Sequence, residues 1–128
     1  MIADSSFLVA LFLPEDELHM RAVQELSGIK ENGFFKLVIP DRVLEETFTV
    51  LCYKKGVSYA LEILTKLLHN KDILIYHLEE EEWLSIKKFI EEKNKKMSFT
   101  DYLVAFLALR EHKKILCFDE QIIKLAEV

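Results

Sequence analysis

Short apolar segments rich in β-branched residues alternate with longer segments of helical pattern along the whole of this 128-residue chain. This alternation predicts four strands, at Met1–Asp4, Phe34–Ile39, Asp72–Leu78 and Lys114–Phe118. Strands that are separated by helices usually pair in parallel through crossover connections. We therefore expect an α/β domain with a mainly parallel sheet flanked by helices. The chain has only three Gly and two Pro and no linker, so residues 1–128 are expected to form a single domain.

Capping residues and the apolar period predict the helices between these strands. Ser98 and Asp101 form an S-x-x-D pattern, close to a capping box, at the head of the stretch SFTDYLVAFLAL. The composition of that stretch is typical of a helix buried on several faces. The other predicted helices are Ser5–Leu13, Pro14–Asn32 with Gly28 near its stop, Arg42–Lys55 capped by Asp41 and closed by Gly56, Tyr59–Asn70 capped by Ser58, the amphipathic Glu79–Lys96, and a short one from Glu120.

The charge balance narrows the class of function. The chain has 17 Lys and Arg against 22 Asp and Glu, a net charge of −5, which argues against holding nucleic acid by bulk charge alone. Its start, MIADSSFLVALFLPEDE, lacks the features of a signal peptide, and its apolar run is too short to span a membrane. Cys52 and Cys117 are far apart and no histidine spacing suits zinc, so we expect a cytoplasmic protein with reduced thiols.

Acidic residues stand where several of the predicted strands end. Asp4 ends the first strand and Asp119 follows the last one. Glu45 and Glu46 lie early in the helix after the second strand, and Asp101 lies in the first turn of the helix before the last strand. Because ligands bind outside the carboxyl ends of parallel strands, we expect these acids to meet at that edge of the sheet.

Carboxylates that meet in this way predict a metal site. Several carboxylates cannot stay ionised side by side without a cation. Ligands that are oxygen only, without Cys or His, select a hard ion such as Mg²⁺ or Mn²⁺. Such an ion lowers the pKa of a bound water and neutralises charge that develops on a phosphodiester. The predicted chemistry is therefore hydrolytic phosphoryl transfer.

Each aspartate also has a simpler interpretation. Asp4 and Asp119 can be polar residues that only terminate strands. Asp101 can be a helix-start acid, which the helix dipole favours, with Ser98 as its capping partner. Taken singly, none of these residues decides between the two interpretations.

The glutamate pair is open to the same alternative, because both can be ordinary helix acids. Glu46 shares its i±3/i±4 stripe with Val43 and Val50, whereas a solvated Glu usually has polar neighbours. Glu46 is therefore the better candidate ligand than Glu45.

The segments MIADSSFLVALFLPEDE, LVIPDRVLEETFTVL, MSFTDYLVAFLAL and ILCFDEQI, in this order, resemble the PIN-domain ribonucleases, especially the VapC-type toxins. The resemblance implies a Rossmann-like three-layer fold with four or five parallel strands, dependence on Mg²⁺ or Mn²⁺, and endonucleolytic cleavage of RNA. For toxin members it also implies a homodimer that a cognate antitoxin neutralises. By the family pattern, the catalytic and metal-binding acids fall on Asp4, Glu46, Asp101 and Asp119, with a small polar residue at Ser6.

Two positions depart from that pattern. Many members carry Thr or Ser where this chain has Cys117, and many carry another Asp where it has Gln121. Neither departure removes one of the principal acids, but both thin the outer part of the site and bear on whether a second metal ion binds. A catalytically silent PIN-like module that binds RNA or protein is therefore the alternative. A response-regulator receiver ranks last, because ADSS offers only one acid after the first strand.

Basic residues near the acids are the candidates for binding RNA phosphates. Lys93, Lys95 and Lys96 lie immediately before the helix that carries Asp101, and Arg42 starts the helix that carries Glu46. The alternative is an ordinary solvated lysine loop.

Overall fold

Four parallel strands form a single sheet at the centre of the computed structural model, which describes residues 1–33 and 35–127. They are β1 (Ile2–Ala3), β2 (Leu37–Pro40), β3 (Ile73–Tyr76) and β4 (Ile115–Leu116). Their spatial order is β3-β2-β1-β4, and every neighbouring pair is parallel. This confirms the predicted α/β fold with a parallel sheet. Phe34, where the second strand was predicted to begin, lies outside the described residues, and β2 itself begins at Leu37.

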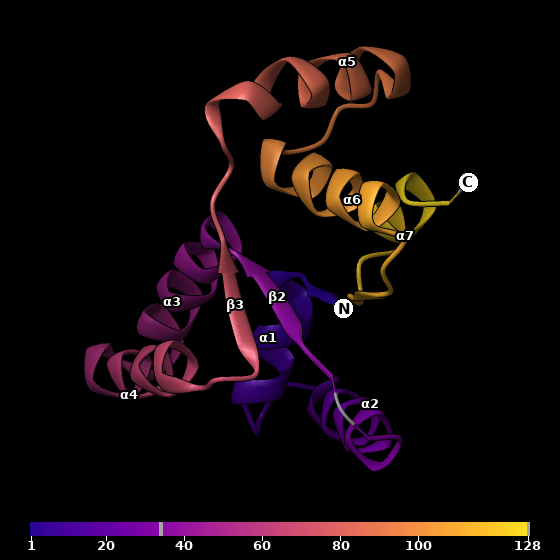
Figure 1. Ribbon diagram of the computed structural model, residues 1–128. Coiled ribbons are helices and arrows are strands. Elements are labelled where there is room, and N and C mark those ends of the chain that lie inside the picture. Colours follow the sequence, from indigo (N-terminus) through magenta and orange to yellow (C-terminus); the bar gives the residue numbers. More distant parts are fainter. Residues whose placement is uncertain (34, 128) are drawn as a thin grey trace.

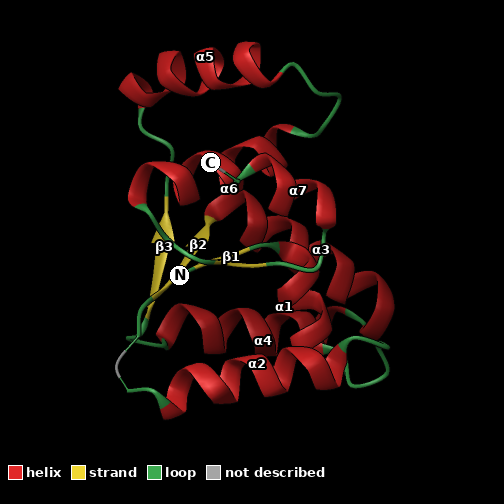
Figure 2. Ribbon diagram, turned by 90° about the vertical axis from the view of Figure 1, so that its right-hand side faces the viewer, coloured by secondary structure: helices red, strands yellow, loops and turns green. Residues whose placement is uncertain are grey.

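Helices cover both faces of the sheet. One group connects β1 to β2 and β2 to β3, and the other joins β3 to β4 and follows β4. Figure 1 shows the first group on one side of the sheet and the second on the other, and Figure 2 shows α2 and α4 opposite α6 and α7. The first group is α1 (Ser5–Phe12), α2 (His19–Glu31), α3 (Asp41–Lys55) and α4 (Val57–His69); the second is η1, a 3₁₀ turn (Glu80–Glu82), α5 (Trp83–Lys93), α6 (Phe99–Glu111) and α7 (Glu120–Leu125).

The core lies between the sheet and helices α1, α3, α4 and α6. Helix α6 buries most of its length, which agrees with its predicted burial on several faces. Phe7 and Leu8 of α1 are also fully buried, next to the central strand β1. This packing fixes the two chain segments that carry Asp4 and Asp101. No helix in the described part of the chain is long and apolar enough to cross a membrane.

Two predicted N-caps are wrong. Asp41 is the first residue of α3 and caps nothing; its Oδ2 lies 3.0 Å from Nδ1 of His77 instead. Ser58 is the second residue of α4 and makes no cap hydrogen bond, because α4 already begins at Val57. Gly56 ends α3 as predicted, and its φ of +93° lets the chain turn directly from α3 into α4.

The helix predicted from Pro14 is also shorter than expected. Asp16 forms a local turn, in which its Oδ1 accepts a hydrogen bond from the Leu18 amide at 2.8 Å. This turn delays the start of α2 to His19. The helix runs through Gly28 and ends at Glu31, followed by Gly33 with a φ of +108°.

Candidate active site

The candidate site lies at the carboxyl ends of β1 and β4, where the order of the sheet reverses. From β1 the chain moves to β2 and β3 on one side, and then returns to place β4 on the other side of β1. Asp4 directly follows β1, and its amide donates a hydrogen bond to the Leu116 carbonyl of β4 at 3.0 Å. Such a reversal leaves a crevice above the strand ends, which is where open α/β sheets bind ligands.

Asp4 is a buried carboxylate that also caps a helix. Its side chain is the N-cap of α1, and its residue is only 3% exposed. Oδ2 accepts hydrogen bonds from the Ser6 amide at 3.3 Å and from the Ser6 hydroxyl at 3.0 Å. Oδ1 accepts no hydrogen bond from the described residues. No fully buried side-chain oxygen among them lacks a partner, so Oδ1 is not fully buried. Oδ1 is therefore the oxygen that Asp4 can offer to a cation.

Cys117 supplies a further donor to the same oxygen. Its Sγ lies 3.5 Å from Oδ2 of Asp4 and accepts a hydrogen bond from the Asp119 amide at 3.1 Å. Burial, together with the negative charge of Asp4, raises the pKa of the Cys117 thiol to about 12. The residue therefore stays a neutral thiol and occupies the place of the hydroxyl expected from the family resemblance. The Ser6 hydroxyl links this side to the next loop, because it accepts a hydrogen bond from the Phe118 amide at 3.0 Å.

Asp101 and Asp119 both lie at helix N-termini. Asp119 is the N-cap of α7, and its Oδ1 accepts a hydrogen bond from the Gln121 amide at 2.9 Å. Asp101 lies in the first turn of α6, where the Ser98 hydroxyl accepts a hydrogen bond from its amide at 3.1 Å. The predicted cap at Ser98 is thus confirmed. With Asp4 at the start of α1, three helix N-termini carry acids, and each dipole favours the negative charge.

Glu46 projects from the second turn of α3, and Val43 on the same stripe is buried. Although Glu46 as a residue is exposed, desolvation of its carboxyl group raises its pKa. A hydrogen bond from Ser5 opposes this effect, while the charges of Asp4 and Asp101 add to it. Ser5 is a contact that the sequence pattern does not reveal.

These electrostatic effects connect the candidate acids. Burial also raises the pKa of Asp101, and the charges of Asp4 and Asp119 raise it further against hydrogen bonding from Ser98. The pKa of Asp101 thus responds to the charges of Asp4 and Asp119, and the pKa of Glu46 responds to those of Asp4 and Asp101. No Lys, Arg or His of the described residues forms an ion pair with any of the four. An oxygen-only donor set with uncompensated negative charge fits a hard divalent cation in its chemistry.

The four acidic side chains have the chemistry of metal ligands but are not arranged around a common point. Within residues 1–33 and 35–127, no three Asp, Glu, His or Cys side chains are grouped so that they could hold a metal ion as they stand. The three aspartates are each hydrogen bonded to a donor in their own segment, namely Ser6 for Asp4, Ser98 for Asp101 and Gln121 for Asp119. Glu46 is hydrogen bonded to Ser5, which comes from α1.

The candidate RNA-binding residues separate into two kinds. Arg42 lies in the first turn of α3, with its guanidinium 5.1 Å from the centre of the Phe99 ring. Lys93 ends α5, and its ammonium lies over the Phe89 ring. Lys95 and Lys96 are exposed in the loop before α6, and the main chain of Lys95 is held by the Tyr102 hydroxyl. The loop is thus anchored while its ammonium groups face solvent.

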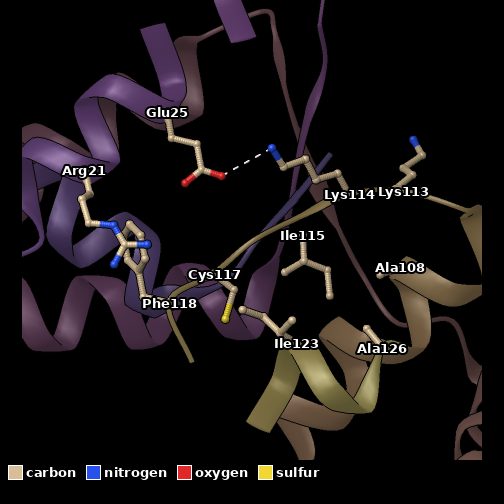
Figure 3. A pocket seen from close by; sticks show the side chains of 10 residues that line it. All are labelled: Arg21, Glu25, Ala108, Lys113, Lys114, Ile115, Cys117, Phe118, Ile123 and Ala126. Atoms are coloured by element: carbon tan, nitrogen blue, oxygen red, sulfur yellow. Dashed lines mark ion pairs between the residues drawn. The ribbon is translucent and has the colours of Figure 1, made fainter. Parts of the chain in front are cut away.

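A cavity of about 400 Å³ adjoins the site on the far side of β4. Figure 3 shows Arg21 beside the Phe118 ring and the ion pair of Lys114 with Glu25, whose Nζ–Oε1 distance is 3.5 Å. The cavity contains none of the four acids and reaches the site only through Cys117 and Phe118. Arg21 was missed by the sequence analysis, because nothing in the spacing of α2 connects it with the last strand.

Comparisons with known proteins agree with this geometry. The model of the PIN domain family matches residues 1–128. Among solved structures, the fold is similar to that of VapC20 from Mycobacterium tuberculosis, which is described as a toxin that cleaves the sarcin-ricin loop. The TM-score is 0.79 at 18% identity, over 99% of this chain and 95% of VapC20. No curated protein matches the sequence significantly. At this identity, the likeness to VapC20 is one of fold.

Proposed function

The chain belongs to the PIN domain family, and on that premise we propose that it is a Mg²⁺- or Mn²⁺-dependent endoribonuclease. The observation that carries the proposal is the electrostatic coupling of Asp4, Glu46, Asp101 and Asp119, which come from four separate segments of the chain. These residues would hold the ion. When bound, it would lower the pKa of the attacking water and offset the charge that develops on the phosphodiester.

The remaining residues of the site position the acids. Ser6 and Cys117 both donate hydrogen bonds to Oδ2 of Asp4, so they fix its carboxylate and leave Oδ1 to the ion. Ser98 orients the first turn of α6, and with it Asp101. The N-termini of α1, α6 and α7 contribute positive dipole ends near the phosphate that is cleaved.

Cleavage of a labelled single-stranded or looped RNA tests the proposal. We expect endonucleolytic products with 5′-phosphate ends in Mg²⁺ or Mn²⁺, because a water attacks the phosphorus directly, and no cleavage in EDTA. The control is Asp4→Asn purified in the same way, which should be inactive and so excludes a contaminating ribonuclease. Cleavage that persists undiminished in EDTA would refute the metal mechanism.

One observation favours a second candidate, a catalytically silent PIN-like module. The described acids are not grouped as a ready metal site, and Cys117 and Gln121 replace residues that many members carry. Such a module would bind RNA or protein but would cleave no RNA in either metal. The same assay therefore separates the two functions.

We also propose that the protein acts in the cytoplasm as the toxin of a toxin–antitoxin pair and forms a homodimer. The fold likeness to VapC20, described as a toxin, supports this. So do the large apolar side chains exposed on α3 and α4, since such patches mark protein interfaces. They are Tyr53, Val57, Leu61 and Leu68. The measurement is the molar mass in solution, alone and with the product of a short reading frame beside the gene; a monomer in both conditions would contradict the proposal.

A further inference from the structure

Beside the acids, two aromatic rings are stacked at the surface. Trp83 begins α5 and Phe99 begins α6, and their ring centroids lie 5.0 Å apart with an interplanar angle of 28°. Trp83 is 45% exposed. An indole that served only to pack α5 on α6 would be expected to turn further inward, because leaving its apolar surface in water is costly.

Arg42 completes this cluster from a third segment. Its guanidinium carbon lies 5.7 Å from the centre of the Trp83 ring and 5.1 Å from that of Phe99. Among the described residues it forms no ion pair, so its charge is balanced only by the two aromatic faces. A guanidinium held in this way keeps N–H donors for a phosphate.

The cluster borders the proposed cleavage site. Arg42 and Glu46 are four residues apart on α3, so they lie on the same face of the helix, about one turn from each other. Phe99 and Asp101 share the first turn of α6. Helix α3 thus carries both Arg42 and Glu46, and helix α6 carries both Phe99 and Asp101. The contact of Arg42 with Phe99 therefore joins the same two helices that carry the acids.

An open apolar hollow continues from Trp83 along α5. It measures about 470 Å³ and is lined by Trp83, Leu84, Ile86, Ile90 and Phe99, with Lys87 and Glu91 at its rim. Its floor offers no polar side chain that would select a hydrogen-bonding ligand. A flat ring can therefore stack on the indole while the polar groups at its edge keep their hydrogen bonds with water.

We propose that Trp83, Phe99 and Arg42 form a stacking site for one unpaired nucleobase next to the cleaved phosphodiester, with Arg42 on the adjoining phosphate. The choice of RNA as the occupant rests on the proposed function. An exposed aromatic face accepts any base, and a neighbouring cation accepts the phosphate that accompanies it. The site thus favours single-stranded or looped RNA over duplex, in which the bases are already stacked.

The chain contains a single tryptophan, so fluorescence excited at the long-wavelength edge of the indole band, where tyrosine does not absorb, reports on Trp83 alone. The probe is a single-stranded RNA oligomer titrated in EDTA at low salt, with an abasic oligomer of the same length as the control. We expect saturable quenching by RNA and little change with the abasic oligomer. Equal changes with both would mean that backbone charge, not base stacking, is sensed, and no change up to saturating RNA would also overturn the proposal.

Substitutions give a second readout. Trp83→Ala should weaken RNA binding about 5- to 150-fold, the range that one stacked base contributes, whereas Trp83→Phe should keep most of the affinity. In cleavage assays, Trp83→Ala should raise KM more than it lowers kcat. Met20→Ala is the control, because Met20 is a 61% exposed apolar side chain on α2, which covers the other face of the sheet. If Met20→Ala loses as much as Trp83→Ala, or Trp83→Phe loses as much as Trp83→Ala, the stacking site is wrong.

The two proposals fail in different ways. RNA that quenches Trp83 and is never cleaved in Mg²⁺ or Mn²⁺ would support the stacking site and reject the nuclease. Cleavage that Trp83→Ala leaves unchanged, without quenching in the wild type, would reject the stacking site and keep the nuclease. Quenching by an apolar peptide but not by RNA would assign the hollow to a protein partner and overturn the proposal.

Discussion

At the scale of single residues, Asp101 has two electrostatic roles that pull in opposite directions. As an acid in the first turn of α6 it is stabilised by the helix dipole and by Ser98. Burial is the main cause that raises its pKa, and the charges of Asp4 and Asp119 add to the effect. The net direction is upward, so burial and repulsion together outweigh the hydrogen bond from Ser98.

The substitution Asp101→Asn separates these roles. If the burial and repulsion of its charge outweigh the cap, the variant should melt at the same temperature as the metal-free wild type or higher, and it should gain less from Mn²⁺. Because Glu46 and Asp101 hold protons more tightly in the folded state, metal-free wild type should also gain stability as the pH falls through their folded pKa values, and the variant less so. The measurement is a thermal melt in EDTA and in Mn²⁺ at several pH values. A variant that is less stable by roughly 0.3–1 kcal/mol in EDTA, yet gains as much from Mn²⁺, would leave Asp101 as a cap only.

The glutamate pair on α3 gives a second prediction at this scale. Glu46→Gln should abolish metal-dependent cleavage, since Glu46 is the one whose carboxyl group responds to Asp4 and Asp101. Glu45→Gln makes the same chemical change one residue away and should keep most of the activity. The measurement is the initial rate of RNA cleavage at saturating Mn²⁺. Equal losses in both variants would show that the ligand is misassigned or that both residues take part.

At the scale of elements, the turn η1 is fixed to α6 by a polar cluster that the sequence analysis did not anticipate. The run of four Glu from residue 79 favours a helix start, through a reciprocal capping box of Glu79 and Glu82. Glu82 also turns inward, where it accepts hydrogen bonds from Tyr76 and Arg110. This cluster joins the end of β3, the start of α5 and the last turn of α6, so it sets the position of α5 against α6.

Glu82→Gln should therefore destabilise the protein by roughly 1–2 kcal/mol, because it removes the charged acceptor from the partly exposed Arg110. Burial opposes the ionisation of Glu82, but the bonds from Tyr76 and Arg110 prevail and lower its pKa. Its contribution is thus present above its ordinary pKa and is lost as the pH falls through the folded value. The measurement is urea unfolding at neutral and acidic pH. The control is Glu81→Gln, which makes the same change at the exposed neighbouring residue. A difference between the two variants that does not shrink in acid would contradict this assignment.

Sequence patterns predicted the elements better than their ends and their partners. The parallel sheet, the buried α6 and the cap at Ser98 follow from local periodicity and composition, which tertiary contacts here reinforce. Asp41 failed as a cap because it meets His77, which is distant in sequence. The cluster of Trp83, Phe99 and Arg42 could not be predicted either, because its residues come from three segments and none of them lies in a recognisable motif. The four acids could be proposed as one site because parallel topology brings strand ends to the same edge of the sheet.

At the scale of the whole molecule, the proposed ribonuclease function requires an acidic protein to attract a polyanion. The net charge of −5 includes the acids of the site itself, so long-range attraction cannot come from the molecule as a whole. The cations that we propose for RNA binding are instead local, at Arg42 and in the loop of Lys95 and Lys96 before α6. Affinity for RNA should therefore depend on few phosphate contacts.

We therefore expect RNA affinity to depend only weakly on salt, with a few lysines setting that dependence. Each cation that contacts a phosphate of a single strand adds about 0.7 to the slope of log affinity against log salt. Replacing Lys95 and Lys96 together by Gln should therefore lower the slope by about 1.4.

The control replaces Lys54 and Lys55, which lie at the other end of α3, about 20 Å from Arg42 along the helix. Both variants have the same net charge, so a difference between them isolates position from charge. The measurement is RNA binding in EDTA by Asp4→Asn over a series of salt concentrations, with each pair of substitutions added. Equal slopes in the two variants would mean that only the overall charge matters and that the loop before α6 is an ordinary solvated one.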